Sequence, residues 1–475
     1  MEERTKQCKL SLHTLCFPFA RLTKELSNSH YMSINLPQST LPRVVIAGGG
    51  FAGLKLAQDL DARLFQIVLI DHHNYHQFPP LIYQVASSGL EPSSIAFPFR
   101  AAFRRKKNFV FRLANVIGVA PERKRLLTSV GEVEYDYLVL ACGGTTNFFG
   151  NEQIARHSLP MKTLYESMNL RNVLLQNIEK ALVSDSLEAR EALLTVAIVG
   201  GGPSGVEIAG ALAEMKRYVL PKDYPYLETE QFKIHLIDAS PRLLMAMSEK
   251  SSATATKGLE AMGVEIHHQT MVTDYDGKTL TLGDGTKMNT RTVIWVSGIV
   301  ANTLEGLSPE ATGRGKRLLV DGRNELLGYP GIFALGDQCL MTADPAYPQG
   351  HPQMAQVAIQ QAVLLAKNLK AREEGREEKT FHYRDLGSMA TIGRNRAVAE
   401  IGKAKWGGFT AWILWLVVHL RSILSVRNKV IVLLNWLWNY VTYDRSLRLI
   451  LKRHVPVEPY EARRERLENR DTHVD

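Results

Sequence analysis

A glycine-rich turn between a strand and a helix occurs twice in this chain, and it limits the possible folds more than any other feature. The first copy is "RVVIAGGGFAGLKLAQDL" (43–60), in which Gly48, Gly50 and Gly53 form the pattern GxGxxG. In this pattern the first glycine permits a tight turn, the second lets a pyrophosphate approach the backbone, and the third lets the helix pack on the strand. The phosphates lie at the helix N-terminus, where backbone N–H groups have no helical partner. The segment therefore predicts a dinucleotide-binding α/β domain.

The second copy is "LLTVAIVGGGPSGVEIAGALAEM" (193–215), with Gly200, Gly202 and Gly205 in the same positions. Two such turns in one chain predict two bound dinucleotides. The economical chemistry for such a pair is hydride transfer between a nicotinamide and a flavin.

An acid follows each turn at the end of the next predicted strand. Asp71 ends "FQIVLID" and Asp238 ends "FKIHLID", and an acid in this position accepts hydrogen bonds from a ribose. Asp238 lies 38 residues after Gly200, whereas about 20 is usual; a longer helix and the loop "VLPKDYPYLETEQ" account for the excess. An acid here, rather than a cation, favours NAD over NADP, whose additional phosphate attracts a cation.

Two later segments indicate which turn holds which dinucleotide. "YDYLVLACGG" (135–144) reads as a strand that closes the first domain, and "GIFALGDQC" (331–339) reads as a strand followed by Gly336 and Asp337. Flavoproteins with two dinucleotides carry an Asp of this kind beside the ribitol and phosphates of the flavin, so we expect Asp337 to bind FAD. The first turn is then expected to hold FAD and the second NADH, with the NADH domain inserted in the flavin domain.

The predicted fold is α/β, with two Rossmann-like dinucleotide-binding domains arranged as in the flavoprotein disulfide reductases, and a C-terminal region of amphipathic helices that binds a membrane. The predicted boundaries are, in chain order, a disordered extension (1–40), the first part of the FAD domain (41–160), the inserted NADH domain (161–316), the second part of the FAD domain (317–385), the membrane-binding region (386–455) and a charged tail (456–475).

Several other classes of site are not expected. The four cysteines, Cys8, Cys16, Cys142 and Cys339, form no CxxC cluster, so we predict no iron–sulfur cluster, structural zinc or disulfide framework. The Asp-rich segment 274–286 lacks the five ligand positions and final Glu of an EF-hand loop. Two Asp-Gly turns around a short strand explain it better. We therefore expect no metal site.

Positive charge is concentrated near the C-terminus. The chain has a net charge of +9, and residues 403–453 contribute +8 of it through nine Lys or Arg and one acid. The rest of the chain is close to neutral, which argues against binding of nucleic acid.

The same region is rich in tryptophan, since five of the six tryptophans lie between Trp406 and Trp438. Its uncharged runs, 406–420 and 430–443, have fifteen and fourteen residues, fewer than the ~20 of a spanning helix. Apolar helices edged by Trp and cations are typical of segments that lie in the membrane interface, and five buried Trp side chains would contribute roughly 12 kcal/mol before opposing costs. We predict a lipid-binding surface within 406–453, with a homodimer interface as the alternative. Its predicted apolar face comprises Phe409, Trp412, Ile413, Leu416, Val417 and Leu420.

Together these segments resemble the type II NADH dehydrogenases, which are single-subunit, non-pumping NADH:quinone oxidoreductases. The resemblance extends from Arg43 to Leu451. Besides the glycine turns it rests on "DHHNYHQFPPLIYQVASSGL" (71–90), "TVIWVSGIVAN" (292–302), "HPQMAQVAIQQA" (351–362) and the tail 427–450. The last two segments are the specific ones, because the turns alone would fit many flavoprotein disulfide reductases.

The resemblance implies roles for individual residues. Gln356 and Gln360 match the quinone-site glutamines; they lie four apart on one helix face, and each offers donors and acceptors to a quinone carbonyl. Glu207 matches an acid near the nicotinamide and flavin that assists movement of hydride and protons, although the helix dipole alone also favours an acid there. Gly298 is expected to approach the nicotinamide with its backbone.

The resemblance also implies the reaction and its location. NADH would give a hydride to FAD, and two electrons would then pass to a membrane quinone without proton pumping or a metal. The chain would be a peripheral membrane protein on the cytoplasmic face of a bacterial inner membrane, with the mitochondrial inner membrane as the alternative. Two positions depart from the family pattern: Cys142 replaces a usual Thr beside the flavin, and Ala211 follows Gly210 where Glu is common.

Three other functions fit parts of the sequence. A sulfide:quinone oxidoreductase shares the fold but needs redox cysteines near the flavin, for which Cys142 and Cys339 are the candidates. A soluble ferredoxin-type reductase would not need the Trp-rich tail. A flavoprotein that senses NADH without quinone turnover is the alternative from a different class.

Overall fold

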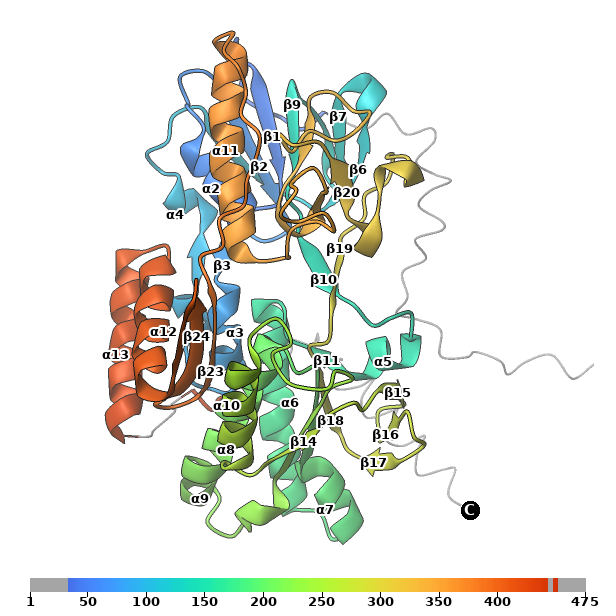
Figure 1. The fold of residues 1–475 in the computed structure, drawn as a ribbon, viewed down its shortest axis with the longest axis vertical. Coiled ribbons are helices and arrows are strands. Elements are labelled where there is room, and N and C mark those ends of the chain that lie inside the picture. Colours follow the sequence, from blue (N-terminus) through green and yellow to red (C-terminus); the bar gives the residue numbers. More distant parts are fainter. Residues whose placement is uncertain (1–32, 443–446, 452–475) are drawn as a thin grey trace, which may run out of the picture.

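A computed structural model of the protein describes residues 33–442 and 447–451 (Figure 1). The predicted disordered extension lies outside the described residues up to position 32, and so does all of the predicted charged tail, 456–475. Figure 1 shows two α/β domains, one above the other, with the C-terminal helices beside both. This is the predicted fold class.

The first domain is built on a five-stranded parallel sheet with the order β21-β9-β1-β2-β5. Its strands are β1 (Arg43–Ala47), β2 (Gln66–Asp71), β5 (Phe109–Leu113), β9 (Tyr137–Leu140) and β21 (Ile332–Ala334). Every residue of β2 is buried, as expected for a parallel strand covered on both faces. Helices α2 (Phe51–Asp59) and α11 (Ala355–Glu373) pack against each other on this sheet. This sheet therefore combines four strands that precede the second domain in the sequence with one strand, β21, that follows it.

Smaller elements complete the first domain. They are β3 (Tyr75–Gln77) paired with β4 (Ala96–Pro98), the antiparallel sheet of β6 (Val116–Ala120), β7 (Arg125–Thr128) and β8 (Gly131–Glu134), the pair β20 (Leu318–Val320) and β22 (Cys339–Met341), and the short helices α3 (Ile82–Ala86) and α4 (Phe99–Ala102). Helix α3 leaves this domain and contacts α6 and α8 of the second.

The second domain repeats the design with a parallel sheet of order β11-β18-β12-β13-β14. Its strands are β11 (Leu159–Pro160), β12 (Thr195–Val199), β13 (Lys233–Ile237), β14 (Val264–His267) and β18 (Thr292–Trp295). Its helices are α5 (Glu152–His157), α6 (Leu164–Leu182), α7 (Leu187–Leu194), α8 (Pro203–Tyr218), α9 (Leu220–Asp223) and α10 (Glu249–Glu260). Two strands that run between the domains, β10 (Gly144–Thr146) and β19 (Ile299–Ala301), pair antiparallel and join them (Figure 1).

The Asp-rich segment of this domain forms a meander of β15 (Val272–Tyr275), β16 (Thr279–Leu282) and β17 (Lys287–Asn289). The Asp276 carboxylate accepts hydrogen bonds from the backbone amides of Lys278 and Thr279, both at 2.7 Å. Asp284 does the same for the Thr286 amide at 2.9 Å. The prediction of two Asp-Gly turns around a strand is confirmed.

The C-terminal region contains a sheet that the sequence analysis missed. Strands β23 (Ser388–Gly393), β24 (Arg396–Ile401) and β25 (Ala404–Gly407) form an antiparallel sheet ahead of helices α12 (Gly408–Ser422) and α13 (Val426–Thr442). The hairpin turns use left-handed backbone at Asn395 and Gly402, with φ of +61° and +58°. Within the described residues, no helix is long and apolar enough to cross a membrane.

The tryptophans of this region divide between the interior and the surface, so the expectation that all five bind lipid was wrong. Trp415 is only 1% exposed and belongs to the same hydrophobic cluster as helix α8. The indole of Trp436 donates to the Gln84 side-chain oxygen at 2.8 Å. Trp438, by contrast, is 59% exposed. Because α12 and α13 are apolar on more than one face, spacing alone could not say which face packs on the protein.

Candidate functional site

The first glycine turn has the shape of a phosphate cradle. Gly48 has φ of +101°, and a Cβ there would lie 2.3 Å from the Ala141 carbonyl oxygen. A Cβ on Gly53 would lie 1.8 Å from the Gly48 oxygen, whereas a Cβ on Gly50 would meet nothing within 4 Å. Gly48 and Gly53 are therefore required by the protein itself. The space at Gly50 is open for a ligand's phosphates, so the turn fits the FAD pyrophosphate.

The second turn repeats these features. Gly200 has φ of +118°, a Cβ on Gly205 would lie 1.8 Å from the Gly200 oxygen, and the space at Gly202 is open. This turn fits a second dinucleotide in the same way.

The two predicted ribose acids hold these turns in shape. Asp71 accepts hydrogen bonds from the amides of Gly49 at 2.6 Å and His73 at 2.7 Å. Asp238 accepts from the amides of Gly201 and Ser240. A carboxylate offers about four acceptor positions, so each acid retains capacity for a ribose hydroxyl.

The two kinds of glycine should give different mutational signatures. We expect Gly205→Ala to destabilise the NADH domain, because its Cβ would overlap the Gly200 carbonyl. Gly202→Ala should leave the melting temperature nearly unchanged and raise the KM for NADH at least tenfold, because its Cβ would occupy the open space at the helix N-terminus. Thermal denaturation and steady-state kinetics test both. A loss of stability in Gly202→Ala would contradict this division of roles.

Asp337 and Gly298 lie in the turns that follow β21 and β18. The Lys162 ammonium donates to the Asp337 carboxylate at 3.3 Å, and the amide of Gly336 donates to Gln361 on α11 at 2.8 Å. Gly298 has φ of +80°, and its carbonyl accepts from the Asn147 amide at 3.2 Å. The Gly298 turn is therefore tied to the segment that joins the domains.

The two described cysteines are poor candidates for redox chemistry. Burial raises the pKa of Cys142 to about 12 and that of Cys339 to about 11. The Cys142 thiol donates to the Ala47 carbonyl at 3.4 Å, and Cys339 accepts from the side chains of Asn324 and Gln361. Neither is a thiolate at neutral pH, which disfavours the sulfide:quinone alternative.

Gln356 and Gln360 lie on one face of the first turns of α11 and hold the chain that leads into β23. The Gln356 amide donates to the Gly387 carbonyl at 3.1 Å and accepts from the Leu386 amide at 3.0 Å. Gln360 makes the same pair of bonds with the backbone of Arg384, at 2.8 and 3.1 Å. Their contact with a quinone stays a prediction.

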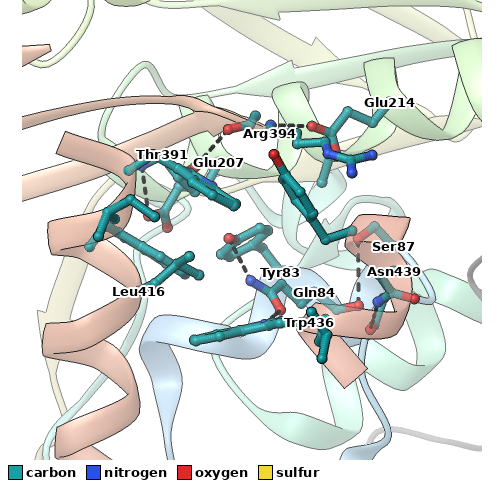
Figure 2. A pocket seen from close by; sticks show the side chains of 18 of the residues that line it. Tyr83, Gln84, Ser87, Glu207, Glu214, Thr391, Arg394, Leu416, Trp436 and Asn439 are labelled. Carbon is teal, nitrogen blue, oxygen red and sulfur yellow. Dashed lines mark hydrogen bonds between the residues drawn. The ribbon is translucent and has the colours of Figure 1, made fainter. Parts of the chain in front are cut away.

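A largely apolar cavity of about 510 Å³ lies between α3, α8, β23, α12 and α13. Figure 2 shows Glu207 and Thr391 in one part of its wall, with Tyr83, Gln84 and Trp436 in another. All six residues of the predicted apolar face of α12 line it. The sequence analysis missed the contributions of α3 and β23. For α3, the resemblance of 71–90 to a family segment was the available signal.

Glu207 is the buried acid of this cavity. It is 9% exposed, and burial raises the pKa of its carboxyl group to about 8, although the Thr391 amide donates to it at 3.4 Å. Glu207 is therefore mostly protonated at pH 7. Gly210, which precedes the departure at Ala211, is required by packing: a Cβ there would lie 1.8 Å from the Ile392 carbonyl oxygen, so α8 and β23 touch backbone to backbone.

Comparison with known proteins agrees with this geometry. Residues 42–362 match the family of pyridine nucleotide-disulphide oxidoreductases, and residues 386–442 match the NDH2 C-terminal domain. The type II NADH:quinone oxidoreductase Ndh of Mycobacterium tuberculosis is 35% identical over 419 residues, which cover 85% of this chain and 89% of the mycobacterial protein.

Solved structures share the fold. NDH2 from Plasmodium falciparum, in complex with NADH, is similar with a TM-score of 0.79 and 20% identity, over 86% of this chain and all of that one. The sulfide:quinone oxidoreductase of Aquifex aeolicus has a TM-score of 0.65 at 16% identity, over 86% of this chain and 96% of its own.

The two glycine turns and their sheets therefore define a pyridine nucleotide-disulphide oxidoreductase. Within that class, the chain belongs to the type II NADH:quinone oxidoreductase family.

Proposed function

We propose that this chain holds FAD at the turn of Gly48, Gly50 and Gly53, oxidises NADH at the turn of Gly200, Gly202 and Gly205, and reduces a quinone in the cavity beside Glu207. The family carries the overall activity: the chain is an FAD-dependent enzyme that passes electrons from NADH to a quinone without pumping protons. When bound, FAD accepts a hydride from NADH and passes two electrons on.

The cavity is the observation that carries the assignment of the quinone site. Its volume of about 510 Å³ lies in the range of small-molecule sites. Its walls are mostly aromatic and aliphatic side chains, which suit an isoprenoid quinone, and Glu207 supplies a proton at the wall. Reduction of a quinone to the quinol consumes two protons, so a protonated acid at this point has a chemical use.

The predicted glutamines connect to this cavity through β23. Each amide uses one N–H and one acceptor position on the backbone of residues 384–387, and each retains a second N–H. We assign that N–H to a quinone carbonyl. Thr391, three residues after the start of β23, lies in the cavity wall.

Helix α13, which forms part of the cavity wall, also presents a surface that suits docking to lipid. Helix α13 carries an exposed apolar stripe, Val430, Leu434, Trp438 and Val441, and the exposed cations Arg421 and Arg427 flank the turn between α12 and α13. This arrangement favours an interfacial location on an anionic membrane. The proposed location is the cytoplasmic face of a bacterial inner membrane.

NADH oxidation by the FAD-loaded protein, with and without a short-chain quinone, tests the function. We expect fast turnover only with quinone, and slower turnover with NADPH. Gln356→Ala should raise the KM for quinone about tenfold, since one hydrogen bond of about 1.4 kcal/mol is lost, while flavin reduction by NADH is retained. Gln58→Ala, at an exposed glutamine on α2, is the control. Flavin reduction without quinone-dependent turnover would instead support the NADH sensor.

A further inference from the structure

Two histidines and a glutamate gather on the NADH domain, outside the proposed catalytic site. Strands β13 and β14 run parallel and in register, with His235 opposite Glu265 and Ile237 opposite His267. All three polar side chains therefore project from one face of the sheet, because residues two apart on a strand share a face. Their ligand atoms lie within 4.8 Å of one another.

The spacing of these atoms is that of a metal's ligand shell. His235 Nδ1 shares a hydrogen bond of 3.1 Å with His267 Nε2 and lies 3.3 Å from a Glu265 carboxylate oxygen. Zn²⁺ binds His nitrogen and carboxylate oxygen at about 2.0–2.2 Å, so two ligands of a tetrahedral ion lie about 3.3 Å apart. These two distances match that edge, and the third pair of ligand atoms, on Glu265 and His267, lies within 4.8 Å.

Burial and charge also fit an ion at this position. The His235 side chain is nearly buried, whereas Glu265 is well exposed, which leaves a path for a hydrated ion to enter. Two cations, Lys233 and Lys216, lie near Glu265; Lys233 is ion-paired with Glu191 at 2.5 Å, and Lys216 is also close to Glu230. Because the neighbouring cations have acidic partners of their own, the Glu265 carboxylate leaves the cluster with a negative charge that favours binding of a cation.

We propose that His235, Glu265 and His267 bind one Zn²⁺ ion or a similar divalent transition-metal ion, with water as the fourth ligand. The ion takes no part in electron transfer, so the site is additional to the proposed function and does not depend on it. It would tie the edge strand β14 to β13 directly beside Asp238, whose amide donates to the His267 carbonyl at 2.9 Å.

Isothermal titration of Zn²⁺ into chelator-treated, FAD-loaded protein without a polyhistidine tag tests the proposal. We expect one tight equivalent, weakened at least about tenfold in both Glu265→Gln and His267→Gln. Co²⁺ should give a visible ligand-field absorption that the same variants lose. His382→Gln, at an exposed histidine elsewhere, should behave as the wild type. Flavin content and melting temperature verify that the variants are folded.

A second cluster, Asp71, His72 and His73, lies at the FAD turn and supplies the discriminating control. If His72→Gln abolishes the tight equivalent while Glu265→Gln and His267→Gln do not, the ion binds there and the proposal fails. It fails equally if the wild type binds no tight equivalent. Both outcomes are independent of quinone turnover, so they leave the proposed function untouched.

Discussion

Replacing Glu207 with Gln is expected to slow quinone reduction about 100-fold, which is the lower end of the effect of general acid catalysis, while NADH still reduces the flavin at close to the wild-type rate. The carboxyl group is buried in the cavity wall and its pKa is about 8, so at pH 7 it carries a proton that it can give to a reduced quinone. The amide of Gln has the same size but no proton to give.

The pH dependence gives this prediction its specific signature. As pH rises through about 8, Glu207 ionises and quinone reduction by the wild type should fall, whereas the slower Glu207→Gln enzyme should lack that fall. Stopped-flow measurement of the two half-reactions between pH 6 and 9.5 separates the steps. A loss confined to flavin reduction by NADH would place Glu207 in the NADH step instead, and an equal loss in both half-reactions would contradict a specific role in quinone reduction. Glu249→Gln, at an exposed acid of α10 outside the cavity lining, is the matched control.

Ionisation of Glu207 should also lower the stability of the folded protein as pH rises. The folded state raises the pKa of Glu207 above its ordinary value of 4.5, so it binds the proton more tightly than the unfolded chain does. The free energy of unfolding of the wild type should therefore fall, relative to Glu207→Gln, as pH rises from about 4.5 to about 8, and then remain constant. Denaturant unfolding across this range measures it.

What the sequence predicts well is local. The requirement for glycine at Gly48 comes in part from its own backbone, with φ of +101°, and the requirement at Gly53 comes from the Gly48 carbonyl in the same turn, so the pattern GxGxxG carries both. The assignment of "GIFALGDQC" to a strand needs only its own apolar run. Its place in the flavin domain was expected from the likeness to flavoproteins with two dinucleotides; the structure has it in the first domain as β21, beside β9.

What it predicts poorly depends on partners far along the chain. Glu207 is buried because β23, about 180 residues later, packs on α8, and because Trp415 of α12 lies beside its carboxyl group. A lone acid near the start of a helix gives no sign of this. The same holds for Trp415 and Trp436, which turn inward only because α3 offers them a surface. Strands β23 to β25 were not predicted because the tryptophans and cations of this region are typical of interfacial helices.

The inward tryptophans change the expected source of membrane affinity. Trp415 is buried in the protein and Trp436 is hydrogen-bonded to Gln84, so the membrane-binding free energy expected from five tryptophans does not apply. The exposed stripe of α13 is then the surface that remains for lipid. Leu434 and Trp438, 58% and 59% exposed, lie on this stripe and outside the cavity lining, so they can be changed without altering the quinone site.

The double variant Leu434→Glu, Trp438→Glu should therefore lower the partition coefficient onto vesicles about 100-fold, because each side chain contributes ~1.5 kcal/mol or more on burial and 1.4 kcal/mol is a factor of ten. Flotation with vesicles of phosphatidylglycerol and phosphatidylethanolamine measures the effect. Turnover with a water-soluble quinone should be unchanged. Val183→Glu, Leu187→Glu, at exposed apolar positions of the NADH domain, is the matched control.

The alternative, a homodimer interface, gives a different outcome in the same experiment. If the stripe is a subunit interface, the double variant should halve the mass in solution while wild-type protein fails to float with vesicles. If it binds lipid, the mass is unchanged and wild-type flotation weakens as salt rises, because Arg421 and Arg427 contribute through screened charge. Cations beside an exposed apolar stripe favour the second outcome, since the cores of subunit interfaces are depleted in charge.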